Sequence, residues 1–297
     1  MILLTETNPL ANVKQEHDER IEHILSDRWI GYPRAKNILQ TMVDLMHHPR
    51  TFRMPNMLLV APTNNGKTLL LQKFFDAYKP VITPDTKQIT IPVLYVQAPP
   101  TPNEKAFYAN ILCALNAPFS PNGTNAMLQL QVIRILKKVE TKILIIDEIH
   151  HILAGAYLSQ RAFLNLIKYL SNELQIVIIG SGIRDAFSAI NTDKQLANRF
   201  EPAVLPTWKP DSEYFRLLSS FEAMFPLKER SNLTKEEIAI KILSMSGGTI
   251  GEISTILKKA AVMAIKTGKE SIDLSLLSKI NYVGPANRQR QYESMLL

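Results

Sequence analysis

The chain has 297 residues and a formal net charge of +7, from 34 Lys and Arg against 27 Asp and Glu. Apolar residues make up 46% and charged residues 21%, which excludes wholesale disorder and leaves ample chain to bury a core. The single cysteine, Cys113, excludes an internal disulfide, a multi-cysteine zinc finger and an iron–sulfur cluster. We expect Cys113 to be a small buried side chain in a helix.

No apolar run is long enough for a transmembrane helix, and the first residues lack the pattern of a secretory signal. With a single cysteine, these features predict a protein of a reducing cytosol. The positive charge is compatible with a polyanionic partner such as DNA, and equally with a mildly basic solvated surface.

In chain order, residues 1–55 form an N-terminal segment with two amphipathic stretches, 19–25 and 35–46. Their apolar residues recur at helical spacing, so we expect two helices. His47 and His48 close the second helix, and we expect both at its exposed end.

Residues 56–205 alternate short apolar runs with amphipathic stretches. Uniformly apolar strands suit a parallel sheet covered on both faces, and the alternation predicts right-handed crossovers in an α/β fold. The expected strands are 57–62, 91–99, 142–148 and 175–182, and the expected helices are 67–78, 104–115, 125–139 and 160–174.

Residues 205–211 (LPTWKPD) contain two prolines and are expected to be a hinge. Beyond the hinge, the apolar residues recur at helical spacing, and this pattern predicts a small all-helical domain at residues 206–283. Residues 284–297 form a short polar tail, in which we expect Arg288 and Arg290 to be exposed. The helices expected after the hinge are 211–225, 235–244, 251–267 and 274–282.

The first predicted strand runs directly into residues 61–68 (APTNNGKT) and then into a helix. The pattern fits a P-loop, except that Ala61 replaces the first glycine. In such a loop, backbone N–H groups point at phosphate oxygens at a helix N-terminus. Lys67 would reach the β- and γ-phosphates, and Thr68 would offer its hydroxyl to Mg²⁺. The other residues expected to line the nucleotide are Thr63, Asn64, Asn65 and Gly66.

A second motif, at residues 143–148 (ILIIDE), is an apolar strand that ends in two adjacent carboxylates. The buried strand would hold Asp147 rigidly against the Mg²⁺ of the P-loop. Glu148, one residue further, would orient or deprotonate the water that attacks the γ-phosphate. The two motifs follow each other in the right order, so the sequence predicts that ATP and Mg²⁺ bind and that ATP is hydrolysed.

These motifs, a polar residue after the fourth strand and an arginine in QLANRF together resemble the AAA+ ATPases. The block from DEIHHILAG to LANRFEP is similar to the TniB branch of the transposition ATPases, which is itself similar to TnsC. The resemblance covers most of residues 30–265. It implies an AAA+ P-loop NTPase, with a parallel sheet between helices followed by a small helical lid domain.

The resemblance also implies further site residues. Ser181 occupies the sensor 1 place, where a polar side chain contacts the γ-phosphate or the attacking water. Arg199 occupies the arginine-finger place, where a guanidinium from one subunit neutralises charge on the nucleotide of its neighbour. A surface salt bridge is the alternative for Arg199, and Arg184, expected near the same edge, competes for the role.

The lid departs from the wider AAA+ pattern. Many members carry an arginine on a lid helix that touches the γ-phosphate, and this chain has Glu252 near that place. A carboxylate beside phosphates would repel them. The departure predicts an altered sensor 2 and hydrolysis that depends on assembly or on a partner.

For function, the resemblance implies an ATP-dependent regulator of DNA transposition in the bacterial cytoplasm. Its subunits would form a ring or filament on double-stranded target DNA, recruit or activate a transposase, work with a target-selection factor and disassemble after hydrolysis. Two alternatives stay open: a helicase-loader or initiator-type AAA+ ATPase, and a nucleotide-dependent DNA-binding scaffold with little hydrolysis.

The candidate DNA contacts are four basic residues. Lys105 follows the second strand, where a pore-facing loop commonly sits in AAA+ proteins. Arg134, Lys137 and Lys138 share one face of the helix before the acidic strand. A solvated basic face is the alternative for each of them.

His150 and His151 follow the acidic pair closely. A metal site would need further ligands that the sequence does not place nearby, so we expect a core or interface role for the two histidines.

Overall fold

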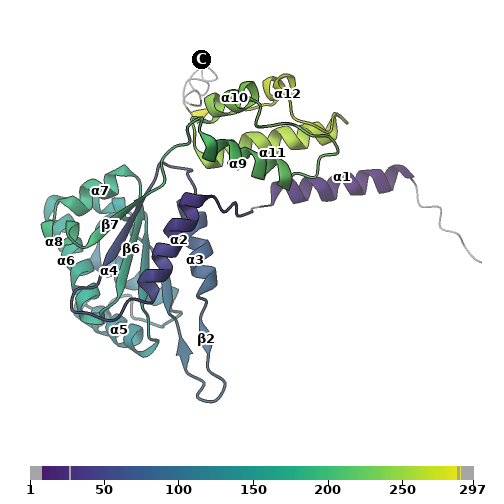
Figure 1. Ribbon diagram of the computed structural model, residues 1–297. Helices are drawn as coiled ribbons and strands as arrows, with labels where there is room; N and C mark the ends of the chain where they lie inside the picture. Colours follow the sequence, from purple (N-terminus) through teal and green to yellow (C-terminus); the bar gives the residue numbers. More distant parts are fainter. Residues whose placement is uncertain (1–8, 27, 286–287, 289–297) are drawn as a thin grey trace, which may run out of the picture. The chain divides into compact units, whose positions relative to one another are not determined.

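A computed structural model describes the chain at residues 9–26, 28–285 and 288. Its contacts divide the chain into two compact units. One is Arg34–Pro206, here called the α/β unit; the other combines Met1–Pro33 with Thr207–Leu297 and is here called the helical unit (Figure 1). In the described part of the chain, no helix is both long and apolar enough to cross a membrane.

The α/β unit is built on a five-stranded parallel sheet in the order β4-β5-β6-β1-β7. The predicted parallel α/β fold is confirmed, and all four expected strands pair in this sheet. The strands are β1 (Asn56–Val60), β4 (Val93–Gln97), β5 (Ile143–Asp147), β6 (Val177–Gly182) and β7 (Phe200–Val204).

The strand β7 is not among the strands expected from the sequence. It contains Pro202, and most of its side chains are exposed, so it shows no apolar run. Proline removes one ladder hydrogen bond, which an edge strand can tolerate. β7 lies at the edge of the sheet, beside β1, and this position explains its composition.

Helices cover both faces of this sheet (Figure 1). Leu144 and Ile146 of β5 belong to a core shared with α4, α5 and α6, whereas Ile143 and Ile145 are buried on the opposite face. The helices, with a short antiparallel hairpin, are α2 (Pro33–Met46), α3 (Lys67–Ala77), β2 (Val81–Ile82), β3 (Ile89–Thr90), α4 (Glu104–Ala114), α5 (Asn125–Lys138), the 3₁₀ helix η1 (Ile149–Ala154), α6 (Tyr157–Leu174), α7 (Arg184–Asn191) and α8 (Lys194–Ala197).

Cys113 is exposed, so the expectation that it is buried is wrong. Its neighbours Ile111 and Leu112 occupy the buried face of α4, which turns residue 113 to the outside. His47 and His48 are exposed at the end of α2, as expected.

The helical unit contains α9 (Ser212–Met224), α10 (Glu236–Ser246), α11 (Ile250–Lys266) and α12 (Leu274–Lys279). It also contains α1 (Pro9–Leu25), which packs against α11 (Figure 1). Ile24 of α1 is buried in the same core as Tyr214 and Leu257.

The expected N-terminal segment 1–55 is therefore divided between the two units, because α1 belongs to the helical unit and α2 to the α/β unit. The second boundary falls between Pro206 and Thr207, inside the stretch expected as a hinge. Just beyond it, the ring of Trp208 meets Tyr32 edge-on, with 4.9 Å between the ring centroids.

Candidate active site

The sheet register brings the ends of the motif-bearing strands to one edge. Val60 at the end of β1 pairs with Gly182 at the end of β6, and Gln97 pairs with Asp147. In a parallel sheet, the loops that follow the strands meet at this carboxyl edge, which is where α/β proteins bind ligands.

The predicted P-loop joins β1 to α3 at this edge. Gly66 lies immediately before α3 with φ of 85°, a left-handed conformation that favours glycine. Thr63, Asn64 and Thr68 are exposed. Asn65 is buried, and its Nδ2 donates to the carbonyl of Leu205 at 2.7 Å. This hydrogen bond ties the P-loop to the segment that follows β7.

Lys67 is 6% exposed, and its Nζ donates to the carbonyls of Ala61 and Pro62, both at 3.0 Å. Burial lowers the pKa of Lys67, and the nearby carboxylates of Glu148 and Asp147 oppose that shift. The two sequence motifs therefore converge at one place in the structure.

Asp147 is 5% exposed, and both of its carboxylate oxygens accept hydrogen bonds. The backbone N–H of Glu148 donates to Oδ1 at 2.9 Å, and the hydroxyl of Tyr95 donates to Oδ2. Burial, followed by the hydrogen bond to Asp147, raises the pKa of Tyr95, so this hydroxyl stays protonated and remains a donor. These contacts fix the orientation of the carboxylate.

Sequence reasoning missed Tyr95. It lies on β4 and pairs with Ile145, two residues before Asp147 on the neighbouring strand. Side chains two residues apart on a strand share a face, so this register puts Tyr95 and Asp147 on the same face of the sheet. The available signal was a tyrosine in an otherwise apolar strand.

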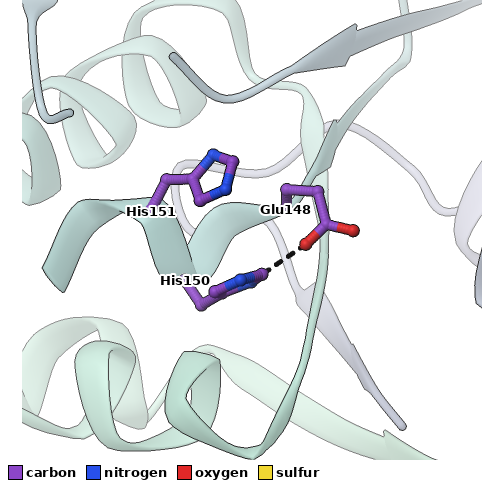
Figure 2. Close-up of side chains that lie close together, drawn as sticks. All are labelled: Glu148, His150 and His151. Atoms are coloured by element: carbon purple, nitrogen blue, oxygen red, sulfur yellow. Dashed lines mark ion pairs between the residues drawn. The ribbon is translucent and has the colours of Figure 1, made fainter. Parts of the chain in front are cut away.

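Glu148 follows β5 in a left-handed conformation, with φ of 53° and ψ of 37°. Such a backbone is strained for a residue other than glycine. Its Oε2 lies 3.1 Å from Nδ1 of His150, within ion-pair distance but outside hydrogen-bond geometry (Figure 2). Burial lowers the pKa of His150 against the opposing effect of Glu148, so the imidazole is neutral at pH 7.

Ser181 is fully buried, one residue before the end of β6. Because Ile145 pairs with Ile179, the residues two positions further along, Asp147 and Ser181, share one face of the sheet. The Oγ of Ser181 has no hydrogen-bond partner among the described residues. A buried hydroxyl without a partner is unfavourable, and a bound ligand or water would supply the missing hydrogen bond.

Arg199 lies at the opposite, amino edge of the sheet. Its carbonyl accepts from the N–H of Asn56, the first residue of β1, and its Nη1 donates to Oδ1 of Asn172 at 2.6 Å. At about 3.3 Å per residue, β1 separates Arg199 from its own P-loop by roughly 13 Å or more.

Arg184 is exposed as the first residue of α7, immediately after β6, and so lies at the carboxyl edge. The expectation that the two arginines share an edge is wrong. They lie at opposite ends of the parallel strands. The helices α7 and α8 connect the carboxyl end of β6 to the amino end of β7, and Arg184 and Arg199 lie at the two ends of this connection.

The candidate DNA contacts also fall in two places. Lys105 is partly buried in the first turn of α4, just after the carboxyl edge. Arg134, Lys137 and Lys138 are exposed towards the end of α5, where Val139 accepts from the N–H of Ile91 near the start of β4. Lys137 also pairs with Glu173 at 2.7 Å.

Glu252 is buried in the helical unit rather than open to phosphate. The hydroxyl of Tyr282 donates to Oε2 at 2.7 Å, and Arg288 donates through Nη1 and Nη2 at 2.9 and 2.6 Å. A two-pronged guanidinium contact balances the carboxylate charge. The expectation that Glu252 repels a bound phosphate is therefore wrong, because its carboxylate is already paired with Arg288. Arg288 is exposed, as expected, and Arg290 lies outside the described residues.

The sheet order, the P-loop before α3 and the acidic end of β5 beside it define an AAA+ P-loop protein. More particularly, the chain belongs to the TniB family: the family described as "Bacterial TniB protein" matches residues 20–210. The resemblance predicted from the motifs is confirmed. A comparison with curated proteins finds no match.

Several solved structures are similar to this chain in fold. The ORC2 protein of Aeropyrum pernix in ADPNP–ADP complexes is 15% identical with a TM-score of 0.61, over 92% of this chain and 74% of that one. Cdc6p from Pyrobaculum aerophilum is 19% identical with a TM-score of 0.58, over 84% and 68%. The A. pernix ORC1 protein in complex with DNA is 14% identical with a TM-score of 0.53, over 87% and 67%. At these identities the likeness concerns the fold alone.

Proposed function

We propose that this TniB-family protein is an ATPase that uses ATP binding to assemble on target DNA and regulate transposition. The observation that carries the proposal is the convergence of Lys67, Asp147 and Glu148 at one edge of the sheet. The same edge presents Ser181, a buried hydroxyl without a partner in the described chain.

The residues of this edge fit ATP with Mg²⁺. Thr68 and Asp147 offer a hydroxyl and a carboxylate, the oxygen donors that Mg²⁺ prefers, and Mg²⁺ bound there would neutralise phosphate charge. Lys67 would exchange its bonds to two loop carbonyls for phosphate oxygens. The backbone N–H groups between Thr63 and Gly66 would surround the phosphates.

Two groups are available for the hydrolytic step. Glu148 is partly exposed beside Asp147 and would orient or deprotonate the attacking water. Ser181 would donate to the γ-phosphate or to that water. Its buried position makes such a hydrogen bond strong, because little solvent competes.

Arg199 would complete the site of a neighbouring subunit. Its distance from its own P-loop argues against action within one chain, whereas a head-to-tail assembly brings the amino edge of one subunit to the carboxyl edge of the next. Such heterologous contacts close into rings or continue as filaments. Arg184, at the carboxyl edge, is the competing candidate.

The DNA part of the proposal rests on charge and on the family. The net charge of +7 favours phosphate contacts, which Lys105 or the group Arg134, Lys137 and Lys138 would make without sequence preference. One protein of similar fold, A. pernix ORC1, has a solved structure in complex with DNA. Recruitment of a transposase and work with a target-selection factor are proposed from the resemblance to the TniB branch of the transposition ATPases, and the match to the TniB family supports them.

Two alternatives have observations in their favour. A scaffold with little hydrolysis would explain why Glu252 stands near the expected place of a lid arginine. An initiator-type or helicase-loader ATPase would fit the similarity to ORC and Cdc6p structures.

Phosphate release with and without duplex DNA separates these functions, using the parent chain and Glu148→Gln. We expect DNA-stimulated release by the parent and about a hundredfold less by the variant, since a positioned general base contributes about 10²–10⁴-fold. The variant should retain ATP, because Lys67, Thr68 and Asp147 are unchanged. A scaffold would show no DNA-stimulated release from either protein.

Electron micrographs of the protein with duplex DNA and a slowly hydrolysed ATP analogue test the assembly. We expect rings or filaments that require the nucleotide. Isolated monomers under these conditions would contradict the assembly, even if ATP is hydrolysed.

A further inference from the structure

The cluster Glu148, His150 and His151 lies just beyond the acidic end of β5. One ligand atom from each residue lies within 4.8 Å of those of the other two. Figure 2 shows the three side chains grouped on one turn, with the carboxylate of Glu148 directed at the ring of His150. In the described part of the chain, no other three His, Cys, Asp or Glu side chains form such a group.

Two imidazole nitrogens of this cluster are buried without a hydrogen-bond partner among the described residues. Nδ1 of His150 and Nδ1 of His151 are both buried, and neither has a hydrogen-bond partner in the described chain. The two rings lie 4.9 Å apart, centroid to centroid. Buried polar atoms without a partner are unfavourable, and two such atoms beside a carboxylate form a set of donors for a cation.

We propose that Glu148, His150 and His151 form a binding site for a transition-metal ion of the Zn²⁺ class, separate from the Mg²⁺ site. Two imidazoles and a carboxylate are a common protein ligand set for Zn²⁺, whereas Mg²⁺ prefers oxygen donors such as those of Thr68 and Asp147. Zn²⁺ bound at about 2.1 Å holds tetrahedral ligand atoms roughly 3.4 Å apart. The ligand atoms that are most widely separated, up to 4.8 Å apart, must therefore approach one another on binding.

Occupancy of this site regulates hydrolysis. An ion held by Glu148 withdraws the carboxylate that activates water and leaves Lys67, Thr68 and Asp147 able to bind ATP. The protein then stays in its ATP-bound state while the ion is present. This regulatory part rests on the proposed function, because it needs Glu148 to act in hydrolysis; the binding of the ion does not.

The first experiment measures Zn²⁺ binding without nucleotide, by calorimetric titration of the full, tag-free chain after removal of metals. We expect about one Zn²⁺ per chain and a loss of affinity of more than about a hundredfold in His150→Ala/His151→Ala, since even outer-shell partners are worth about 10–100-fold. Glu148→Gln keeps the side-chain volume but loses the anionic ligand, and we expect it to weaken binding as well.

The matched control is His47→Ala/His48→Ala. These adjacent histidines are exposed, and their Nδ1 atoms each lie 2.8 Å from a backbone carbonyl, of Val43 and Pro49. This variant should bind Zn²⁺ like the parent. Absence of stoichiometric binding by the parent, or loss of binding in the control but not in Glu148→Gln, would overturn the site.

The second experiment measures phosphate release and ATP retention at millimolar Mg²⁺, with and without micromolar Zn²⁺. We expect Zn²⁺ to suppress release by about tenfold or more in the parent and the control, with ATP retention unchanged. Zn²⁺ that binds without slowing release overturns the regulation but keeps the site. A parent that never releases phosphate contradicts the proposed function, and the calorimetric titration then still decides whether the ion binds.

Discussion

The hydroxyl of Ser181 is buried without a hydrogen-bond partner in the described part of the chain, and this suits the role in hydrolysis proposed for it. Its hydroxyl sits on the same sheet face as Asp147 and finds no partner in the described residues. Ser171 offers a matched comparison: it is equally buried, and its hydroxyl donates to the carbonyl of Ile176 at 3.1 Å. The two serines therefore predict opposite results when the hydroxyl is removed.

Ser181→Ala should leave the free energy of unfolding unchanged or raise it by up to about 1 kcal/mol, because an unpaired buried hydroxyl is lost. Phosphate release should fall about a hundredfold, as for the loss of a catalytic hydrogen-bond donor. Ser171→Ala should lose about 1 kcal/mol of stability and keep its activity. Denaturant titration and a phosphate assay measure both properties. Full activity in Ser181→Ala would show that the hydroxyl does not contact the reacting groups.

Tyr95 holds the carboxylate of Asp147 in place, so Tyr95→Phe should weaken the binding of Mg²⁺ by Asp147. We expect the Mg²⁺ concentration for half-maximal phosphate release to rise severalfold, because an outer-shell hydrogen bond to a metal ligand is lost. Tyr214→Phe is the control, since its hydroxyl donates to the carbonyl of Ala239 at 2.8 Å in the helical unit. It should lose about 1 kcal/mol of stability without changing the Mg²⁺ dependence. Equal Mg²⁺ dependence in both variants would contradict the role of Tyr95.

At the scale of elements, α1 is the clearest departure from the domain division expected from the sequence. Arg20 anchors this helix to the helical unit through Glu270, at 3.0 Å between Nη1 and Oε1, and through the carbonyl of Pro226. Both side chains of the ion pair are largely buried. Glu16 and Lys228 form a second bridge between the same parts of the chain, but that pair is exposed.

Arg20→Ala should therefore destabilise the helical unit by about 2 kcal/mol, whereas Glu16→Ala should cost no more than about 1 kcal/mol. The hydrogen bonds from Arg20 hold the pKa of Glu270 below its usual range. Since the folded-state pKa is depressed, this stabilisation is fully present above the ordinary glutamate pKa of 4.5 and is lost as pH falls through the lower, folded-state value. Thermal melts of both variants across this pH range measure the difference. A loss of the same size in both variants would show that α1 is not anchored by this pair.

At the scale of the whole molecule, the position of Arg199 predicts cooperation between subunits. Glu148→Gln and Arg199→Ala should each be inactive alone, but a mixture should recover part of the phosphate release. In a random equal mixture, roughly a quarter of the head-to-tail junctions combine an intact Glu148 with an intact Arg199 from the neighbour.

The control for this mixing experiment is Arg184→Ala. Arg184 lies at the carboxyl edge and, if it is the true finger, its variant and not Arg199→Ala should be rescued by Glu148→Gln. Mixtures that never exceed the activity of the separate variants would exclude an arginine supplied by a neighbouring subunit.

The sequence by itself determined the class of protein and the two motifs on which the proposed nucleotide site rests. Lys67 and Thr68 stand in a contiguous loop, and Asp147 and Glu148 end an uninterrupted apolar strand. Contiguous patterns of this kind need only local geometry and a buried strand to place their side chains. The four apolar strands and most helix positions could be predicted for the same reason.

Tertiary structure alone decided the contacts that join distant segments. The register of β4 against β5 brings Tyr95 to Asp147, and the packing of α1 assigns it to the helical unit rather than to its neighbour α2. The left-handed turn at Glu148 gathers its carboxylate with His150 and His151. Such contacts depend on how helices and strands pack and on the backbone conformation of single residues. The apolar periodicity of a sequence predicts neither of these.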